Sequence, residues 1–286
     1  MSRFTCVWNN RMTFPFRCWM IKKEPFLFTF HATCKRRASR NFTSTGYERA
    51  IDGILKRKPE VARAILEHTE VTRNHMTPEV QLFLLTPSCE LYNAPFENIS
   101  EEEEEMKKRV FTEPFWSIYW PGGQALTRFV LDEARELVSF SEKILDLGAG
   151  CGATAIAAKL IGAKKVVAND IDEVACTAIS MNAALNNVDI EVSGENLLRR
   201  PPDKLTDVIF IGDMLYDEEI AGILIPWLEE ARRNRTRIYF GDPGRHGLTE
   251  DLKKRLRIRK RYSLPENVRK ENYGYDRMQL TLIVVP

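Results

Sequence analysis

The sequence lacks any apolar run approaching the roughly 18 consecutive residues that a membrane-spanning helix needs. Cysteine is also scarce, with six in 286 residues, and none forms a CxxC pair or a cluster with histidine. A zinc site or a disulfide framework is therefore not indicated, and we expect no metal. The composition, 44% hydrophobic and 29% charged, is typical of an ordinary globular protein.

Acidic residues are almost absent from the first 46 positions, where Glu24 stands alone against nine lysines and arginines. A basic, acid-poor start that ends in a Ser/Thr-rich stretch, here "SRNFTSTG", is typical of a mitochondrial transit segment. A disordered basic tail is the alternative, since Pro15 and Pro25 would interrupt a long amphipathic helix. We expect residues 1–46 to be a transit segment and the mature protein to lie in the mitochondrial matrix.

The rest of the chain has the opposite balance, with 33 basic and 39 acidic residues once those positions are removed from the totals of 42 and 40. A surface with that balance is a poor candidate for phosphate backbones. We therefore expect no nucleic-acid partner. We also expect no membrane partner, because long apolar runs are lacking, and we expect a monomer.

Two regions follow the basic segment. Residues 47–110 contain apolar residues at helical spacing and predict a helical N-terminal appendage that covers one end of the core. Residues 111–286 alternate strands and helices, which predicts an α/β domain with a doubly wound parallel sheet. Its predicted strands are 143–147, 165–169, 188–193, 207–212 and 236–241, and its predicted helices are 153–161, 173–186 and 217–233. Residues 273–286 contain a polar turn and a last strand, which fit an antiparallel hairpin at the sheet edge.

A glycine-rich turn, "GAGCGA", follows the first predicted strand of this domain. Ligands of doubly wound sheets bind beyond the carboxyl ends of the strands. Gly148, Gly150 and Gly152 let the backbone turn tightly and approach a ligand without an intervening Cβ, and Ala149 lies between them. The pattern also satisfies the GxGxx(G/A) of dinucleotide sites, so the glycines alone leave an oxidoreductase open.

Two acids flank the turn. Asp146 ends the first strand, where it would repel a pyrophosphate but hold an α-ammonium group by a charge-assisted hydrogen bond. Asp170 ends the second strand, where an acid can accept bonds from both hydroxyls of a ribose. Helix capping is the alternative role for Asp170 and, more strongly, for Asp172. A ligand with both an amine and a ribose fits best, and S-adenosylmethionine is such a ligand.

The segments "ILDLGAGCGATAIAA" and "VVANDID" resemble the first and second motifs of the seven-stranded class I methyltransferases. The resemblance implies a Rossmann-like sheet of seven strands. It also implies that an acid or an asparagine after the third strand contacts adenine, and "VSGENLL" offers Glu195 and Asn196 there. We favour Asn196, because an amide pairs readily with a base edge.

The end of the fourth strand, "DMLYD", faces the methyl group in that fold. Enzymes that methylate amino groups of nucleic acids and glutamine place (N/D)PP(Y/F) here, whereas Met214 and Leu215 stand in place of the prolines. The Asp-x-x-Tyr pattern of Asp213 and Tyr216 instead resembles the protein-lysine methyltransferases of family 16. "WPGGQAL", which begins at Trp120, resembles the Trp-Pro segment that packs beside the cofactor in that family.

Four segments, "TEVTRNHMTPEVQLFLLTP", "YWPGGQAL", "GDMLYD" and "FGDPGRHGL", together resemble mitochondrial lysine methyltransferases of the electron transfer flavoprotein beta subunit. These enzymes are related to the bacterial methyltransferases of ribosomal protein L11. The resemblance implies that the substrate is the electron transfer flavoprotein beta subunit. Asp213 would orient the lysine amine and Tyr216 would line its channel, although ordinary packing is the alternative for Tyr216. Methylation of another protein, such as a ribosomal protein, and a scaffold without catalysis remain alternatives.

Overall fold

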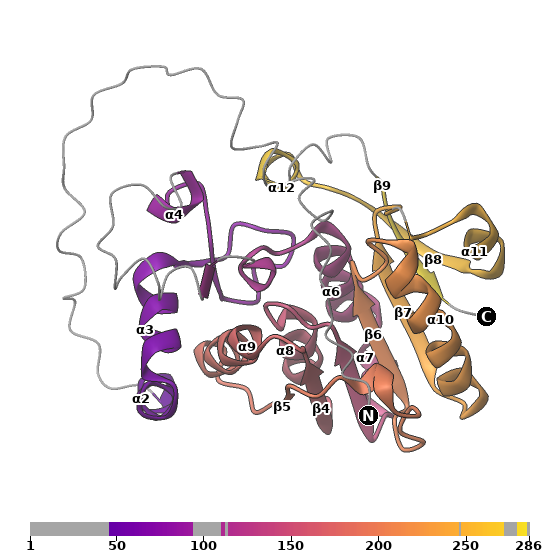
Figure 1. Cartoon of the computed structure of the whole chain (residues 1–286), viewed down its shortest axis with the longest axis horizontal. Helices are drawn as coiled ribbons and strands as arrows, with labels where there is room; N and C mark the ends of the chain where they lie inside the picture. Colours follow the sequence, from indigo (N-terminus) through magenta and orange to yellow (C-terminus); the bar gives the residue numbers. More distant parts are fainter. Residues whose placement is uncertain (1–45, 94–109, 112–113, 246, 272–278, 285–286) are drawn as a thin grey trace, which may run out of the picture. The chain divides into compact units, whose positions relative to one another are not determined.

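The computed structural model describes residues 46–93, 110–111, 114–245, 247–271 and 279–284 (Figure 1). These residues all belong to one compact unit, Ser44–Pro286, while the other unit, Met1–Thr43, lies outside the described residues. The predicted transit segment therefore lies almost entirely outside them. No helix in the described part is long and apolar enough to span a membrane.

A seven-stranded sheet with the order β5-β4-β3-β6-β7-β9-β8 forms the centre of this unit. The strands from β5 to β7 are parallel, and β9 runs antiparallel to both β7 and β8. This is the predicted α/β, doubly wound class I methyltransferase sheet. The strands are β3 (Lys143–Leu147), β4 (Lys165–Asn169), β5 (Glu191–Ser193), β6 (Val208–Gly212), β7 (Arg237–Asp242), β8 (Arg257–Ser263) and β9 (Gln279–Val284).

Helices cover both faces of the sheet because successive residues of its strands point to opposite sides. Ile144 and Phe210 belong to one buried cluster, which also contains Phe129 of α6. Leu145 and Ile209 belong to a second cluster, on the side of α10. The helices of this domain are α6 (Pro121–Glu133), α7 (Arg135–Ser139), α8 (Ala153–Leu160), α9 (Glu173–Leu185), α10 (Glu218–Arg233), α11 (Glu250–Arg255) and α12 (Glu266–Glu271), with short 3-10 turns η1 (Phe115–Ser117) and η2 (Leu197–Arg199).

The strand order reverses beside β3. The chain runs outward from β3 through β4 to β5, and then returns to β6 on the other side of β3. The carboxyl ends of β3, β4 and β6 therefore border the switch point, where open α/β sheets bind ligands. This placement follows from the topology alone.

The part before the domain is less purely helical than its spacing predicts. It contains α2 (Gly46–Arg57), α3 (Pro59–His68) and α4 (Glu90–Asn93), but also a two-stranded antiparallel sheet of β1 (Glu70–Thr72) and β2 (Leu82–Leu84). Ile54 of α2 and Ile65 of α3 share a buried cluster with Met181 of α9. The proposed boundary between an appendage and a domain stays a prediction, and the shared cluster indicates that the two fold together.

Two predicted elements differ in detail. The third strand begins at Glu191 rather than at residue 188, because Asn187 has a φ of 54° and the chain is still leaving α9 there. The C-terminal antiparallel pair is present, but it is β8 with β9, joined by a connection that contains α12 instead of a tight turn. The pair lies beside β7, so β8 is the last strand of the sheet.

Candidate functional site

The glycine turn joins β3 to α8 through three left-handed residues. Gly148, Gly150 and Gly152 have φ angles of 65°, 53° and 77°. A Cβ on Gly148 would lie 2.4 Å from Sδ of Met214, so a side chain there would be strained and Met214 would have to shift. A Cβ on Gly150 would have nothing closer than the Cα of Trp116, at 4.0 Å, which leaves that backbone open as a cradle.

Asp146 lies beneath this turn and not in an open crevice. Its side chain is buried, and its Oδ2 accepts a hydrogen bond of 2.9 Å from the backbone N–H of Ala155 in the first turn of α8. Burial raises the pKa of Asp146 to about 7, and the negative charge of Asp170 adds to the rise. A cation bound nearby would favour the charged form. The predicted contact with an ammonium group stays a prediction, and the structure adds a role in fixing the start of α8.

Asp170 ties the glycine turn to the end of β4. Its Oδ2 accepts the N–H of Gly150 at 2.9 Å, and its Oδ1 accepts the N–H of Asp172 at 3.1 Å. Burial raises the pKa of Asp170. The cap of α9 is Asp172, whose side chain accepts the N–H of Val174. Capping therefore does not explain Asp170, and each of its oxygens keeps a lone pair for a further donor.

Asn169 is a positioning residue that sequence reasoning misses. It is buried at the end of β4, and its Nδ2 donates to the carbonyl oxygens of Ser193 and Glu195, both at 2.9 Å. Its own carbonyl accepts the N–H of Ala149 at 2.9 Å. Asn169 thus holds the loop after β5 against the glycine turn. The sequence marks Asn169 only as a polar amide residue between the apolar residues of a strand and the acid Asp170.

Asn196 lies at the carboxyl end of β5, where its exposed side chain precedes η2. Its neighbour Glu195 forms an ion pair with Arg200. Of the two candidates for the adenine contact, Glu195 therefore already has a charged partner within the protein. The preference for Asn196 stays a prediction.

Asp213 follows β6 in a left-handed conformation, with a φ of 57°. Its Oδ2 accepts the N–H of Gly123 at 2.7 Å, and its Oδ1 accepts Nε of Arg245 at 2.9 Å. The side chain is 6% exposed, and burial raises the pKa of Asp213 while the charge of Arg245 opposes the rise. Oδ1 also lies 2.9 Å from Nη2 of Arg245, so it receives two donors of one guanidinium, and this carboxylate is better suited to fixing geometry than to taking up a proton.

Arg245 is the second positioning residue that sequence reasoning misses. Its guanidinium lies over the ring of Trp120, with Cζ 5.1 Å from the ring centroid, while it pairs with Asp213. The buried Asp242 presents it, because its Oδ1 accepts the N–H groups of Gly244 and Arg245, both at 2.7 Å. Burial, with the charge of Asp213, raises the pKa of Asp242 to about 6. The loops after β6 and β7 and the start of α6 therefore meet at one ion pair.

Trp120 and Tyr216 come from different segments, since Trp120 directly precedes α6 and Tyr216 lies three residues after Asp213. Nε1 of Trp120 donates to the carbonyl oxygen of Phe115 at 3.0 Å. Tyr216 is 50% exposed, so ordinary core packing does not account for it. Partial burial, followed by the charges of Asp217 and Asp170, raises the pKa of Tyr216, which keeps the phenol neutral. The role of each aromatic ring towards a substrate stays a prediction.

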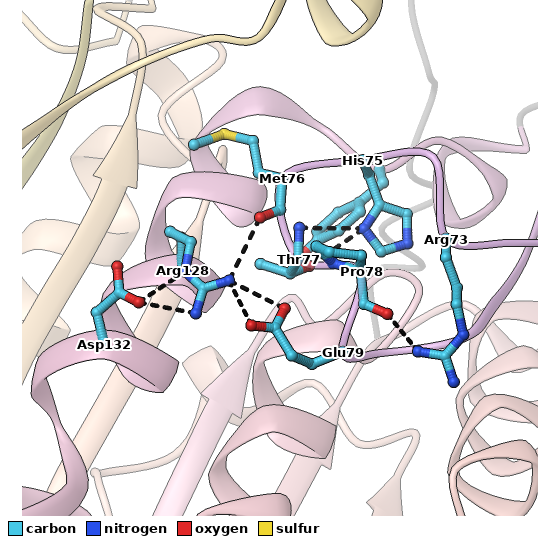
Figure 2. Close-up of polar contacts among 9 residues, drawn as sticks. Arg73, His75, Met76, Thr77, Pro78, Glu79, Arg128 and Asp132 are labelled. Carbon is cyan, nitrogen blue, oxygen red and sulfur yellow. Dashed lines mark hydrogen bonds and ion pairs between the residues drawn. The ribbon is translucent and has the colours of Figure 1, made fainter.

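A segment before the domain fixes the residues that precede α6 (Figure 2). Arg128 of α6 binds both carboxylate oxygens of Glu79, at 2.8 and 2.9 Å, and pairs with Asp132. Nδ1 of His75 accepts the N–H of Thr77 at 3.3 Å, and the Thr77 hydroxyl lies 3.1 Å from the Tyr119 hydroxyl. This segment is therefore anchored directly beside the Trp-Pro sequence.

His75 makes this anchoring sensitive to acid. Burial lowers the pKa of His75 to about 4, so the histidine is neutral when the protein is folded. The unfolded chain takes up the proton near pH 6.5, so this stability is complete above about pH 6.5 and is lost as the pH falls towards 4. We expect the free energy of unfolding to fall by about 3 kcal/mol more in the wild type than in His75→Asn between pH 7 and 4. Urea titrations of both proteins measure it, and parallel curves would refute the assignment.

Comparisons with known proteins identify methyltransferases as relatives of this chain. Residues 122–225 match the family model described as ribosomal protein L11 methyltransferase (PrmA). The electron transfer flavoprotein beta subunit lysine methyltransferase of Xenopus laevis is 41% identical over 213 residues, which cover 73% of this chain and 81% of the relative. The human protein of the same name is 42% identical over 224 residues, with coverage of 76% and 79%.

Solved structures are more distant. The ribosomal protein L11 methylase from Lactobacillus delbrueckii subsp. bulgaricus aligns with a TM-score of 0.42 and 24% identity, covering 56% of this chain and 78% of that one.

Proposed function

Because the chain belongs to the family of electron transfer flavoprotein beta subunit lysine methyltransferases, we propose that it transfers methyl groups from S-adenosylmethionine to lysines of that subunit. The membership makes it an enzyme, a protein-lysine methyltransferase. The substrate, the methyl donor and the mitochondrial matrix as location are the proposed parts. The relatives' names support the substrate, and the carboxyl ends of β3 and β4 support the donor.

The observation that most supports S-adenosylmethionine as the methyl donor is the pair of acids, Asp146 and Asp170, around an open glycine turn. A Cβ on Gly150 would meet no heavy atom closer than 4.0 Å, and the N–H of this glycine is fixed by Asp170. Asp170 would hold the ribose, Asp146 would favour the ammonium end by charge, and Asn196 would meet the adenine. S-adenosylmethionine, when bound, supplies a methyl group on a sulfonium sulfur. The residues present fit these parts.

The residues after β6 would position the side chain of the substrate lysine. A lysine side chain has a pKa of about 10.4, so it must lose a proton before its lone pair can attack. Asp213 and Arg245 form a fixed ion pair, and they would hold the Trp120 and Tyr216 rings as the walls of the lysine channel. Much of the acceleration would then come from alignment, which is worth effective molarities on the order of 10⁵ M or more. The proton would leave to water, since the Asp213 carboxylate is held by two nitrogens of Arg245 and by the N–H of Gly123.

The second candidate is methylation of a ribosomal protein, which the family model over residues 122–225 favours. Labelled S-adenosylmethionine and a mitochondrial extract distinguish the two. We expect the wild type to label one band of the mass of the electron transfer flavoprotein beta subunit, and Asp170→Ala to label none at low donor concentration. A band that comigrates with a ribosomal protein would replace the proposed substrate.

The matrix location predicts the behaviour of the N-terminus. A fusion of residues 1–46 to a fluorescent reporter should enter mitochondria, because nine basic residues face one acid there. A matched fusion in which the arginines of this segment are changed to glutamine should stay in the cytosol. Microscopy and cell fractionation measure both, and a cytosolic wild-type fusion would contradict the location.

A further inference from the structure

The end of α11 and the strand β8 that follows it carry a dense run of positive charge. The sequence "KKRLRIRKR", from Lys253 to Arg261, has seven lysines and arginines in nine positions. Four of them have carboxylate partners, in the pairs Lys253–Glu250, Lys254–Asp251, Arg255–Glu229 and Lys260–Glu133. The other three, Arg257, Arg259 and Arg261, are exposed and have no ion pair within the part of the chain that the structure describes. We call these three residues the arginine edge.

The register of the sheet carries the arginine edge to the level of the site. Arg261 of β8 pairs with Thr281 of β9, and Thr281 pairs in turn with Asp242, the last residue of β7. Arg257 is level with Tyr239 through Val284, and because the pairing shifts by one residue between Ile258 and Lys260, Arg257 and Arg261 extend from opposite faces of this edge. Strands lie about 4.8 Å apart, so Arg261 lies roughly 10 Å across the sheet from Asp242. Asp242 binds the backbone of Arg245, and Arg245 pairs with Asp213. Arg261 therefore lies near the edge of the sheet where the lysine would be methylated.

We propose that the arginine edge is a docking surface for an acidic face of the protein whose lysine is methylated. This inference rests on the proposed function and adds the chemistry of the substrate surface to it. Guanidinium groups suit this role because they bind carboxylates through two parallel hydrogen bonds. Such contacts guide a charged partner and set its orientation, so that its lysine arrives at the channel.

Two simpler explanations fit less well. Charges on an edge strand discourage pairing with other chains, but a strand that serves only this purpose would not expose Ile258, which is 48% exposed between Arg257 and Arg259. A nucleic acid would need a broad basic surface, whereas the chain beyond its first 46 residues has 33 basic and 39 acidic residues. A local basic strip with an apolar residue is typical of a protein contact.

The test compares two triple variants of the full chain with equal changes in charge. The first is Arg257→Glu/Arg259→Glu/Arg261→Glu. The control is Lys204→Glu/Arg232→Glu/Arg233→Glu, three exposed positions towards the amino ends of the parallel strands, away from the site. Methylation of the electron transfer flavoprotein beta subunit is measured at low salt, together with S-adenosylhomocysteine affinity by calorimetry. A short lysine peptide without an acidic surface serves as a second acceptor.

The edge variant should raise KM for the protein acceptor about tenfold or more. The glutamates would repel the acidic face of the acceptor that the arginines are proposed to attract. Its kcat, its cofactor affinity and its activity on the peptide should stay within about twofold. An unchanged KM, an equal rise in the control, or tight RNA binding that the variant abolishes would each overturn the proposal. If the glutamate variant does not fold, Arg257→Gln/Arg259→Gln/Arg261→Gln gives the same comparison. No labelling by the wild type would instead refute the proposed substrate, which is a distinct outcome.

Discussion

Asp213→Asn should lower kcat and kcat/KM together by about 10²-fold, the scale of the loss when reacting groups are misplaced by about 1 Å. The amide keeps the size and one acceptor for the N–H of Gly123, but it removes the charge that pairs with Arg245. Arg245 would then have a partly buried charge with a weaker partner, and Trp120, which it contacts, would lose its support. The loss should therefore come from geometry at the lysine channel.

Two controls separate this effect from unfolding and from cofactor binding. S-adenosylhomocysteine affinity should change by only a few-fold, since the carboxylate of Asp213 bonds to Gly123 and Arg245, which lie outside the glycine turn. Arg245→Lys keeps the charge but not the fork of donors, so it should retain more activity than Arg245→Gln. Near-wild-type turnover in a folded Asp213→Asn would show that the ion pair is not needed for transfer. Equal activity of the two Arg245 variants would show that the charge of Arg245 is not needed.

Asp170→Ala should weaken S-adenosylmethionine binding by roughly ten- to a hundredfold. The change removes the proposed ribose contact, and it also releases the N–H of Gly150, which fixes the glycine turn. Isothermal calorimetry with S-adenosylhomocysteine measures the loss in the folded variant.

Asp172→Ala is the matched control for this second prediction. It removes the cap of α9 and should cost about 1 kcal/mol of stability while leaving cofactor affinity unchanged. If the two variants bind equally well, Asp170 has no role in the site beyond local structure.

The strands that border the site could be predicted from the sequence because each is a short apolar run that ends at a polar residue. Asp146, Asp170 and Asp213 lie at the ends of β3, β4 and β6 for this reason, and the parallel topology brings those ends to one edge. The glycine turn was equally predictable, since its positive φ angles need residues without a Cβ.

Arg245 and Asn169 could not be predicted in the same way. Arg245 acts through Asp213, 32 positions earlier, and only the neighbouring order of β6 and β7 brings them together. Asn169 bonds to carbonyl groups, which every residue carries, so no sequence pattern marks its partners. The antiparallel β1–β2 pair was hidden for a related reason, because strands of three residues are too short to show an alternating pattern.

We propose that the site at the carboxyl edge of β3, β4 and β6 methylates lysine in the electron transfer flavoprotein beta subunit. Mass spectrometry of that purified subunit, after incubation with this protein and S-adenosylmethionine, tests it most directly. We expect mass steps of one methyl group each, located on lysine, which are absent without the methyl donor and reduced in Asp170→Ala. An unmodified subunit in the presence of a folded enzyme that binds S-adenosylhomocysteine would contradict it.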